Sequence, residues 1–213
     1  LSVGLYDPSK IKAGTSNGAR NEMTADESDA PRIEGELNIS LSQISAGSNL
    51  AISGMYQEAQ PTAAGKGGSE IEAHGIHVGG TLVGGPVALT AHYYNGECLG
   101  ITLQMDAGAM SGDGKCRDHD GYYVQGTYNY GDGKIGASWG GSYQDQAGSD
   151  VGQPTYDTKK HQEMYTLGIY HNLAPEWLAV AEYSHAEESW HNMDTGDEDG
   201  ESDIFSVGMF YLW

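Results

Sequence analysis

Histidine is the residue type in this sequence with the widest chemical scope, and it occurs eight times in 213 residues. An imidazole can bind a transition metal or act as a general base when the fold supplies its partners. His74 and His77 are three residues apart, which places them on opposite faces of a strand. His77 and His92 could share one face of adjacent strands, but the sequence identifies no third ligand. We therefore predict no metal centre at these histidines.

Signatures of enzymes are missing from the sequence. It contains no G-x-S-x-G, no H-E-x-x-H, no phosphate-binding loop and no ordered Ser/His/Asp set. A hydrolase would have to use residues such as His92, His185 or Glu182, and nothing in the pattern singles them out. We predict no catalytic residues and no enzyme.

The acidic run from Asp194 to Asp203 is a candidate for calcium binding. If Gly200 were the turn glycine of an EF-hand, the first and twelfth ligands would be Thr195 and Ser206, where carboxylates are required. We therefore expect a solvated loop and no cofactor. At most, Ca²⁺ or Mg²⁺ would bind weakly at Asp194, Asp197 and Asp199.

Two cysteines, Cys98 and Cys116, lie 18 residues apart in a stretch rich in Gly and Asp. This spacing suits a disulfide that closes one loop, and two thiols do not make a four-ligand metal set. We predict the disulfide, which favours an oxidising compartment.

Composition narrows the class of protein. The net charge of -20 excludes nucleic acid as a partner, because neutralising phosphates requires a basic surface. Hydrophobic residues make up 38% of the chain and the mean hydropathy is -0.49, so few large aliphatic residues are available for a thick core. No apolar run approaches the roughly 18 residues that a membrane helix needs.

The elements that must position these residues show period-2 alternation. In the last segment Phe205, Val207 and Met209 share one face, opposite Ser206 and Gly208. Similar alternation marks about ten strands, of the length and two-sided character of transmembrane β-strands. They cover residues 1–6, 32–41, 50–57, 76–82, 87–94, 122–129, 135–144, 165–170, 177–184 and 205–213.

The connections between these strands alternate between short and long. Short turns are expected at 43–48, 84–86, 131–133 and 172–175, and long polar loops at 10–31, 58–70, 95–120, 145–160 and 187–202. One orientation puts every long loop on the external side of an outer membrane. A soluble β-sandwich also alternates, but it does not need aromatic residues gathered near strand ends. Here those residues are Tyr93, Tyr128, Tyr130, Tyr143, Trp177, Tyr183, Tyr211 and Trp213.

The C-terminal strand resembles the signal that the barrel-assembly machinery reads, with Trp in place of the usual final Phe. The residues that carry this resemblance are Ser206, Gly208, Tyr211 and Trp213. Segments 120–128, 133–138, 164–168 and 181–184 resemble the Gram-negative general porins of proteobacteria, and the likeness extends from about Pro31 onward.

This resemblance implies an antiparallel barrel of roughly sixteen strands in the bacterial outer membrane. It further implies a homotrimer that contacts the lipid bilayer and lipopolysaccharide, with an inward-folded loop narrowing each pore. Since this chain supplies about ten strands, we expect residues 1–213 to be a single barrel domain that lacks N-terminal strands and the constriction loop.

We predict an all-β transmembrane barrel that conducts small hydrophilic solutes and ions passively and prefers cations. A non-conducting barrel acting as receptor, adhesin or scaffold is the alternative, and an outer-membrane hydrolase is less favoured. The predicted pore-lining residues are those that alternation places on the wetter face. They are Arg32, Glu34, Glu36, Asn38, His77, Thr90, His92, Gln125, Thr127, Ser138, Glu182 and Ser184.

Overall fold

A computed structural model describes residues 1–8, 11–12, 24–27, 30–61, 70–100, 108–111, 114–148, 158–192 and 196–211. The strands in these ranges are β1 (Ser2–Tyr6), β2 (Ile11–Lys12), β3 (Thr24–Glu27), β4 (Arg32–Ser40), β5 (Asn49–Pro61), β6 (Ile71–Gly84), β7 (Val87–Glu97), β8 (Asp118–Asn129), β9 (Gly133–Gln144), β10 (Thr158–Ala174), β11 (Trp177–Asn192) and β12 (Gly196–Tyr211). No helix in the described residues is long and apolar enough to cross a membrane.

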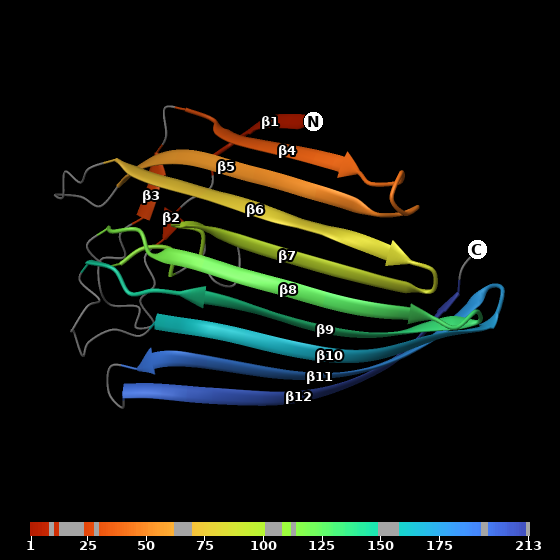
Figure 1. Cartoon of the computed structure of the whole chain (residues 1–213). Helices are drawn as coiled ribbons and strands as arrows, with labels where there is room; N and C mark the ends of the chain where they lie inside the picture. Colours follow the sequence, from red (N-terminus) through yellow and green to blue (C-terminus); the bar gives the residue numbers. More distant parts are fainter. Residues whose placement is uncertain are drawn as a thin grey trace.

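Ten of these strands form one antiparallel sheet, in which each strand pairs with the next in the order β1-β4-β5-β6-β7-β8-β9-β10-β11-β12 (Figure 1). The short strand β2 pairs with β3, and β3 pairs with the end of β5. Within the described residues, β1 and β12 are the two edges and do not pair with each other. The predicted all-β antiparallel class is confirmed.

The register of the sheet sorts the side chains onto two faces. Leu167 pairs with Ala137 and Tyr183, so apolar residues line up across neighbouring strands. Thr166, one residue earlier, pairs with Ser138 and Ser184 on the opposite side. We call the face of Leu167 the apolar face and the face of Thr166 the polar face.

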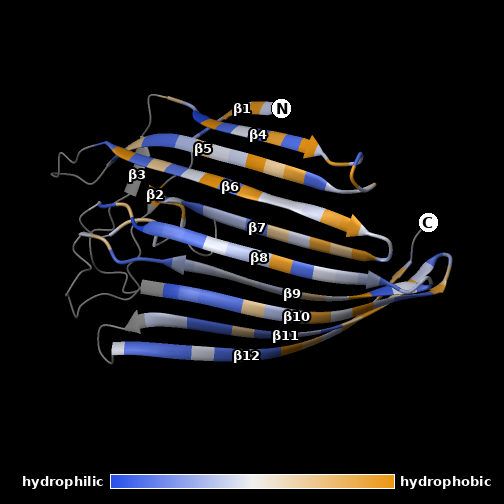
Figure 2. Cartoon of the chain, viewed as in Figure 1, coloured by the Kyte–Doolittle hydropathy of each residue, from blue (hydrophilic) through white to orange (hydrophobic). Residues whose placement is uncertain are grey.

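The side chains of the apolar face are exposed and are not covered by another part of the described structure. Phe205 is 80% exposed and Val207 is 88% exposed, and the same face of the other strands carries many more exposed aliphatic and aromatic residues. Hydropathy also changes along the strands, since β10, β11 and β12 are hydrophilic toward one end and hydrophobic toward the other (Figure 2). A continuous apolar surface of this kind fits a lipid environment, because its exposure to water would be energetically unfavourable.

Tight turns join the strands at one end of the sheet, and the longer connections lie at the other end (Figure 1). Gly85 and Gly131 have φ values of 60° and 99°, which glycine adopts without steric cost. The turns lie where the sequence predicts them. They join β4 to β5, β6 to β7, β8 to β9 and β10 to β11.

The predicted long loops are wrong in extent, because several strands continue far into them. β11 runs to Asn192 and β12 begins at Gly196, so most of the expected loop 187–202 is a paired hairpin. β10 begins at Thr158, β5 extends to Pro61, and the expected loop 10–31 contains β2 and β3. The prediction treated polarity as a loop signal, whereas a strand that is wet on both faces keeps its backbone ladder with polar side chains.

A small core packs on the polar face near the end that carries the long connections. Ile11 of β2, Ala59 of β5 and Ile71 and Ala73 of β6 are buried together with Met110 from the connection between β7 and β8. Ala59, Ile71 and Ala73 have the same register parity as Ser53 and His77. The β7–β8 connection therefore lies over the polar face instead of projecting away from it.

Candidate functional site

All twelve residues predicted to line a pore lie on the polar face, according to the strand register. They come from six strands and are Arg32, Glu34, Glu36, Asn38, His77, Thr90, His92, Gln125, Thr127, Ser138, Glu182 and Ser184. The register shows a shared face, and it does not test whether this face lines a pore.

A row of hydroxyl and amide side chains crosses the middle of the polar face. Thr90, Gln125, Ser138, Thr166 and Ser184 pair with one another in sequence from β7 to β11. At the two ends of the row, Thr81 and Thr90 are joined by a hydrogen bond of 2.9 Å, and Thr166 and Ser184 by one of 2.8 Å. Such groups can exchange hydrogen bonds with passing water and solutes.

Charged groups gather at the β4 side of the polar face. Arg32 forms an ion pair of 2.9 Å with Glu34 and lies 5.4 Å from the centre of the Tyr6 ring. Glu36 lies two residues further along β4, on the same face, and pairs with Ser53. A cavity of about 690 Å³ opens here, with Glu34, Glu36, Ser53 and His77 among its lining residues.

The sequence prediction missed two cations on this side of the sheet. Lys134 stands 4.7 Å over the Tyr170 ring, and the Tyr170 hydroxyl donates a hydrogen bond to Glu182. Alternation could have identified Lys134, because it shares the parity of Ser138. Arg117 is fully buried and donates from Nη1 to the Gly108 carbonyl at 2.8 Å. No sequence signal indicates that contact, since it depends on how the β7–β8 connection folds.

The β7–β8 connection turns back at its first residues. Cys98 has a φ of 58° and Gly100 a φ of 80°, and both values lie in the left-handed region. Leu99 then packs over Gly75 and Gly96, where a Cβ on Gly96 would come within 2.8 Å of the leucine side chain. Because the two glycines have no side chains, the returning chain can pack closely against β6 and β7 at these positions.

The predicted disulfide closes this connection, and the structure confirms it: Cys98 and Cys116 are bonded, with their Cα atoms 4.7 Å apart. The amide of Arg117 donates to the Ala109 carbonyl at 3.1 Å, and the Cys98 amide donates to the Arg117 carbonyl at 3.1 Å. These contacts hold the described part of the connection over β5, β6 and β7. That the chain lacks a separate constriction loop stays a prediction.

Two histidines meet in the middle of the polar face. The distance from His77 Nε2 to His92 Nδ1 is 2.8 Å, and the rings stack with centroids 5.0 Å apart. Ser53 Oγ is 3.1 Å from the other nitrogen of His77. Both rings are half-buried and face the open side of the sheet.

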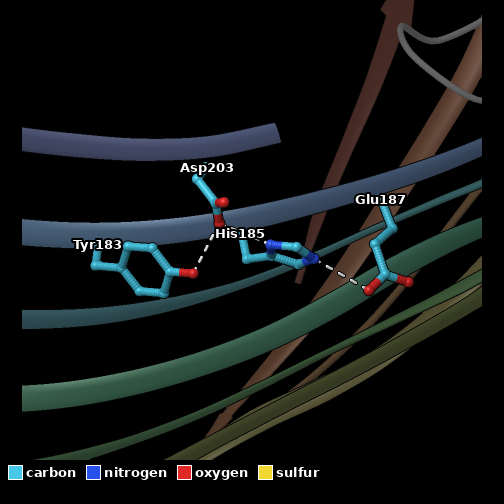
Figure 3. A network of polar contacts seen from close by, with 4 residues as sticks. All are labelled: Tyr183, His185, Glu187 and Asp203. Atoms are coloured by element: carbon cyan, nitrogen blue, oxygen red, sulfur yellow. Dashed lines mark hydrogen bonds and ion pairs between the residues drawn. The ribbon is translucent and has the colours of Figure 1, made fainter. Parts of the chain in front are cut away.

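A second polar network lies on the opposite face, just beyond the apolar residues of β11 and β12 (Figure 3). The Tyr183 hydroxyl donates to Asp203 Oδ1 at 2.7 Å, and His185 Nδ1 is 2.8 Å from the same oxygen. His185 Nε2 is 3.1 Å from Glu187 Oε1. With a carboxylate at each ring nitrogen, both nitrogens donate only if the imidazole is protonated.

The structure does not bring the three hydrolase candidates together. His92 and Glu182 lie on the polar face in different register rows, and His185 lies on the other face. Both nitrogens of His185 already have carboxylate partners, so neither is available as a general base.

Two of the three residues expected to bind divalent ions lie in a strand and not in the expected solvated loop. Asp194 lies outside the described residues, and Asp197 and Asp199 belong to β12. Asp197 forms an ion pair of 2.5 Å with Lys160. Among the described residues, no three His, Cys, Asp or Glu side chains gather as a metal centre. The predictions of no metal centre and no cofactor remain predictions.

The predicted assembly signal occupies the end of β12. Ser206 and Gly208 lie on the polar face, and Tyr211 lies on the apolar face with its ring 5.1 Å from that of Trp177. Trp213 lies outside the described residues.

Comparison with known proteins gives one result for almost the entire chain. The family profile of Gram-negative porins matches residues 6–211. No curated protein and no solved structure matches the chain significantly.

Proposed function

The chain belongs to the Gram-negative porin family, and from this premise we propose that it forms a water-filled channel for passive diffusion of small hydrophilic solutes and ions. Membership places it in the bacterial outer membrane. The proposal includes a closed barrel of roughly sixteen strands, because a barrel of that width leaves an aqueous lumen. The residues that the structure describes supply ten of these strands. It includes no catalytic step.

The observation that carries this proposal is the contrast between the two faces of the sheet. The apolar face exposes residues such as Phe205 and Val207, as a lipid-facing surface requires. The polar face carries the row from Thr90 to Ser184, as a water-filled lumen requires. A receptor or scaffold barrel would also need the first face, but it would not need an open, hydrogen-bonding second face.

The proposed assembly follows from the family. We propose a homotrimer in contact with lipid and lipopolysaccharide, inserted by the barrel-assembly machinery through the end of β12. Ser206, Gly208, Tyr211 and Trp213 are the proposed contacts for that machinery.

The proposed channel prefers cations, because carboxylates outnumber the cations predicted to line it. In the part of the chain that the structure describes, Glu36 and Glu182 form no ion pair with a lysine or arginine, whereas Arg32 is neutralised by Glu34. Lys134, which lies over the Tyr170 ring beside Glu182, is a further cation of the face and does not reverse the excess of carboxylates. At the loop end of β12, Glu198 adds a carboxylate on the polar face, and Asp199, Glu201 and Asp203 add negative charge on the outer side of the same strand. This negative charge concentrates cations within about a Debye length, ~8 Å at physiological salt.

Single-channel recording in planar bilayers tests the channel itself. The full-length protein, purified from outer membranes, should give ohmic current steps in KCl. A correctly inserted protein that gives no steps would contradict the channel and favour the receptor or scaffold alternative.

Reversal potentials under a KCl gradient test the cation preference. The wild-type sign should indicate K⁺ over Cl⁻, and E34Q/E36Q should bring the potential closer to zero by removing two negative charges from the wall. E163Q, which removes a carboxylate on the other face of β10, is the matched control and should leave the potential unchanged. Anion preference in the wild type would refute the assignment.

A further inference from the structure

The sequence predicts no metal centre at His77 and His92 because it identifies no third ligand, but the direct contact between the two rings leads us to revise that expectation. We propose that the pair forms an exchangeable binding site for transition-metal ions of the Zn²⁺ class on the polar face. If the polar face lines a channel, as proposed above, ions of this class pause at the site as they pass. The binding itself does not depend on conduction.

The geometry of the pair supports metal binding. In a hydrogen bond between two imidazoles, the N–H of one ring and the lone pair of the other are both directed into the space between the two nitrogens. His77 Nε2 and His92 Nδ1 are 2.8 Å apart. Two nitrogens at about 2.0–2.1 Å from a tetrahedral zinc are roughly 3.3 Å apart, so the rings would separate by about 0.5 Å and tilt until both lone pairs point at the ion. Each neutral ring would then carry its single proton on its other nitrogen, which for His77 is the Nδ1 that Ser53 Oγ contacts.

The surroundings orient both rings toward this point. Ser53 Oγ lies 3.1 Å from Nδ1 of His77, which leaves Nε2 directed at His92. A partner on the distal nitrogen is the usual way in which proteins fix a metal-binding histidine. Gly79 makes room for the second ring, because a Cβ at this position would lie 2.1 Å from His92 Nδ1. Glu36 pairs with Ser53 and supplies negative charge one strand further along.

The composition of the site selects the class of ion. Imidazole nitrogens suit Zn²⁺, Cu²⁺ and Ni²⁺, whereas Mg²⁺ and Ca²⁺ prefer oxygen ligands. Within the described residues no third histidine, cysteine or carboxylate completes the site. Water would fill the remaining positions, so the ion exchanges and is not held as a structural metal.

Two measurements on the purified full-length protein test this inference with ZnCl₂ as the probe. Isothermal calorimetry measures zinc binding, and planar-bilayer recording measures the K⁺ current as zinc is added. The variants are H77Q and H92Q, each of which removes one ligand, and G79A, which displaces the His92 ring while keeping both histidines. H74Q is the control, since His74 lies on the same strand but on the other face.

Wild type and H74Q should bind zinc equally and lose current in proportion to occupancy, and MgCl₂ at the same concentration should do neither. H77Q, H92Q and G79A should each bind zinc at least tenfold more weakly. Equal zinc affinity in wild type, H92Q and G79A would overturn the site, as would the absence of zinc binding in the wild type. If the wild type binds zinc but conducts no current, the proposed channel fails and the metal site stands.

Discussion

Thr166 and Leu167 are neighbours on β10, yet they meet different surroundings. Thr166 shares a hydrogen bond of 2.8 Å with Ser184 on the polar face. Leu167 pairs with Ala137 and Tyr183 and is 54% exposed on the apolar face. The backbone is the same, so the alternation of side chains alone decides which side of the sheet can face lipid and which can face water.

The two histidine networks sharpen this contrast. On the polar face, His77 meets another imidazole, and a metal ion can take the place of the hydrogen bond between the two rings. On the opposite face, both ring nitrogens of His185 face carboxylates, those of Asp203 and Glu187. Neighbouring residues, more than the histidine itself, determine whether the side chain binds ions or closes an ion-pair network.

The contrast between the two faces predicts the largest effect for a substitution that places a charge on the apolar face. L167R should lower the free energy of unfolding by about 2–4 kcal/mol, the cost of an arginine facing the bilayer interior. T166R, one residue away, should cost only about 1 kcal/mol, from the lost hydrogen bond with Ser184. Urea unfolding in lipid vesicles measures both. Equal costs would show that the two faces do not meet different media.

The next effect concerns the connection that lies over the polar face. Removing the Cys98–Cys116 disulfide in a C98S/C116S variant should lower the free energy of unfolding by about 3 kcal/mol in the chain-entropy model for a loop of this length. The measurement is the same unfolding curve, with the wild type recorded with and without reductant. A reductant that shifts the wild-type curve but leaves the variant unchanged would identify the disulfide as the cause. An unchanged wild-type curve would contradict it.

The smallest effect is expected from the network on the apolar side. H185Q removes an imidazole between two exposed carboxylates, where ion pairs formed by the protonated ring contribute little and salt screens them. The urea midpoint should fall slightly at low salt and match the wild type in high salt. Zinc binding should remain unchanged, in contrast to H77Q. A large loss of zinc affinity in H185Q would show that the two networks are not independent.

The sequence was sufficient for the strands that cross the apolar zone. In segments such as 122–129 and 205–211, one face must be apolar and the other wet, so period 2 is imposed at every residue. Toward the loop ends this constraint disappears, because both faces are wet. Residues 196–203 therefore read as loop although they pair with β11 along their full length.

The same alternation made part of the candidate site predictable, namely the face on which each residue lies. Alternation along the strands predicted that His77 and His92 share one face. Their contact also requires the His92 ring to lie over Gly79, which depends on the register between β6 and β7. The pairing of Cys98 with Cys116 followed from spacing. The packing of Leu99 against Gly75 and Gly96 could not be predicted from spacing, because it joins residues on β6 and β7 to the connection that follows them.

In the proposed channel, glycines on the polar face would also determine the width of the lumen. A Cβ on Gly79 would lie 2.1 Å from the His92 ring, and a Cβ on Gly121 would lie 2.4 Å from the ring of Tyr94, whose hydroxyl reaches across β8 to donate to Ser142 at 2.9 Å. Both rings therefore lie flat against the wall. An alanine at either glycine would push a ring away from the wall, so a single added methyl group would narrow the passage by much more than its own volume. In the proposed channel, a single substitution at either position would therefore change a wide pore into a narrower and more selective one.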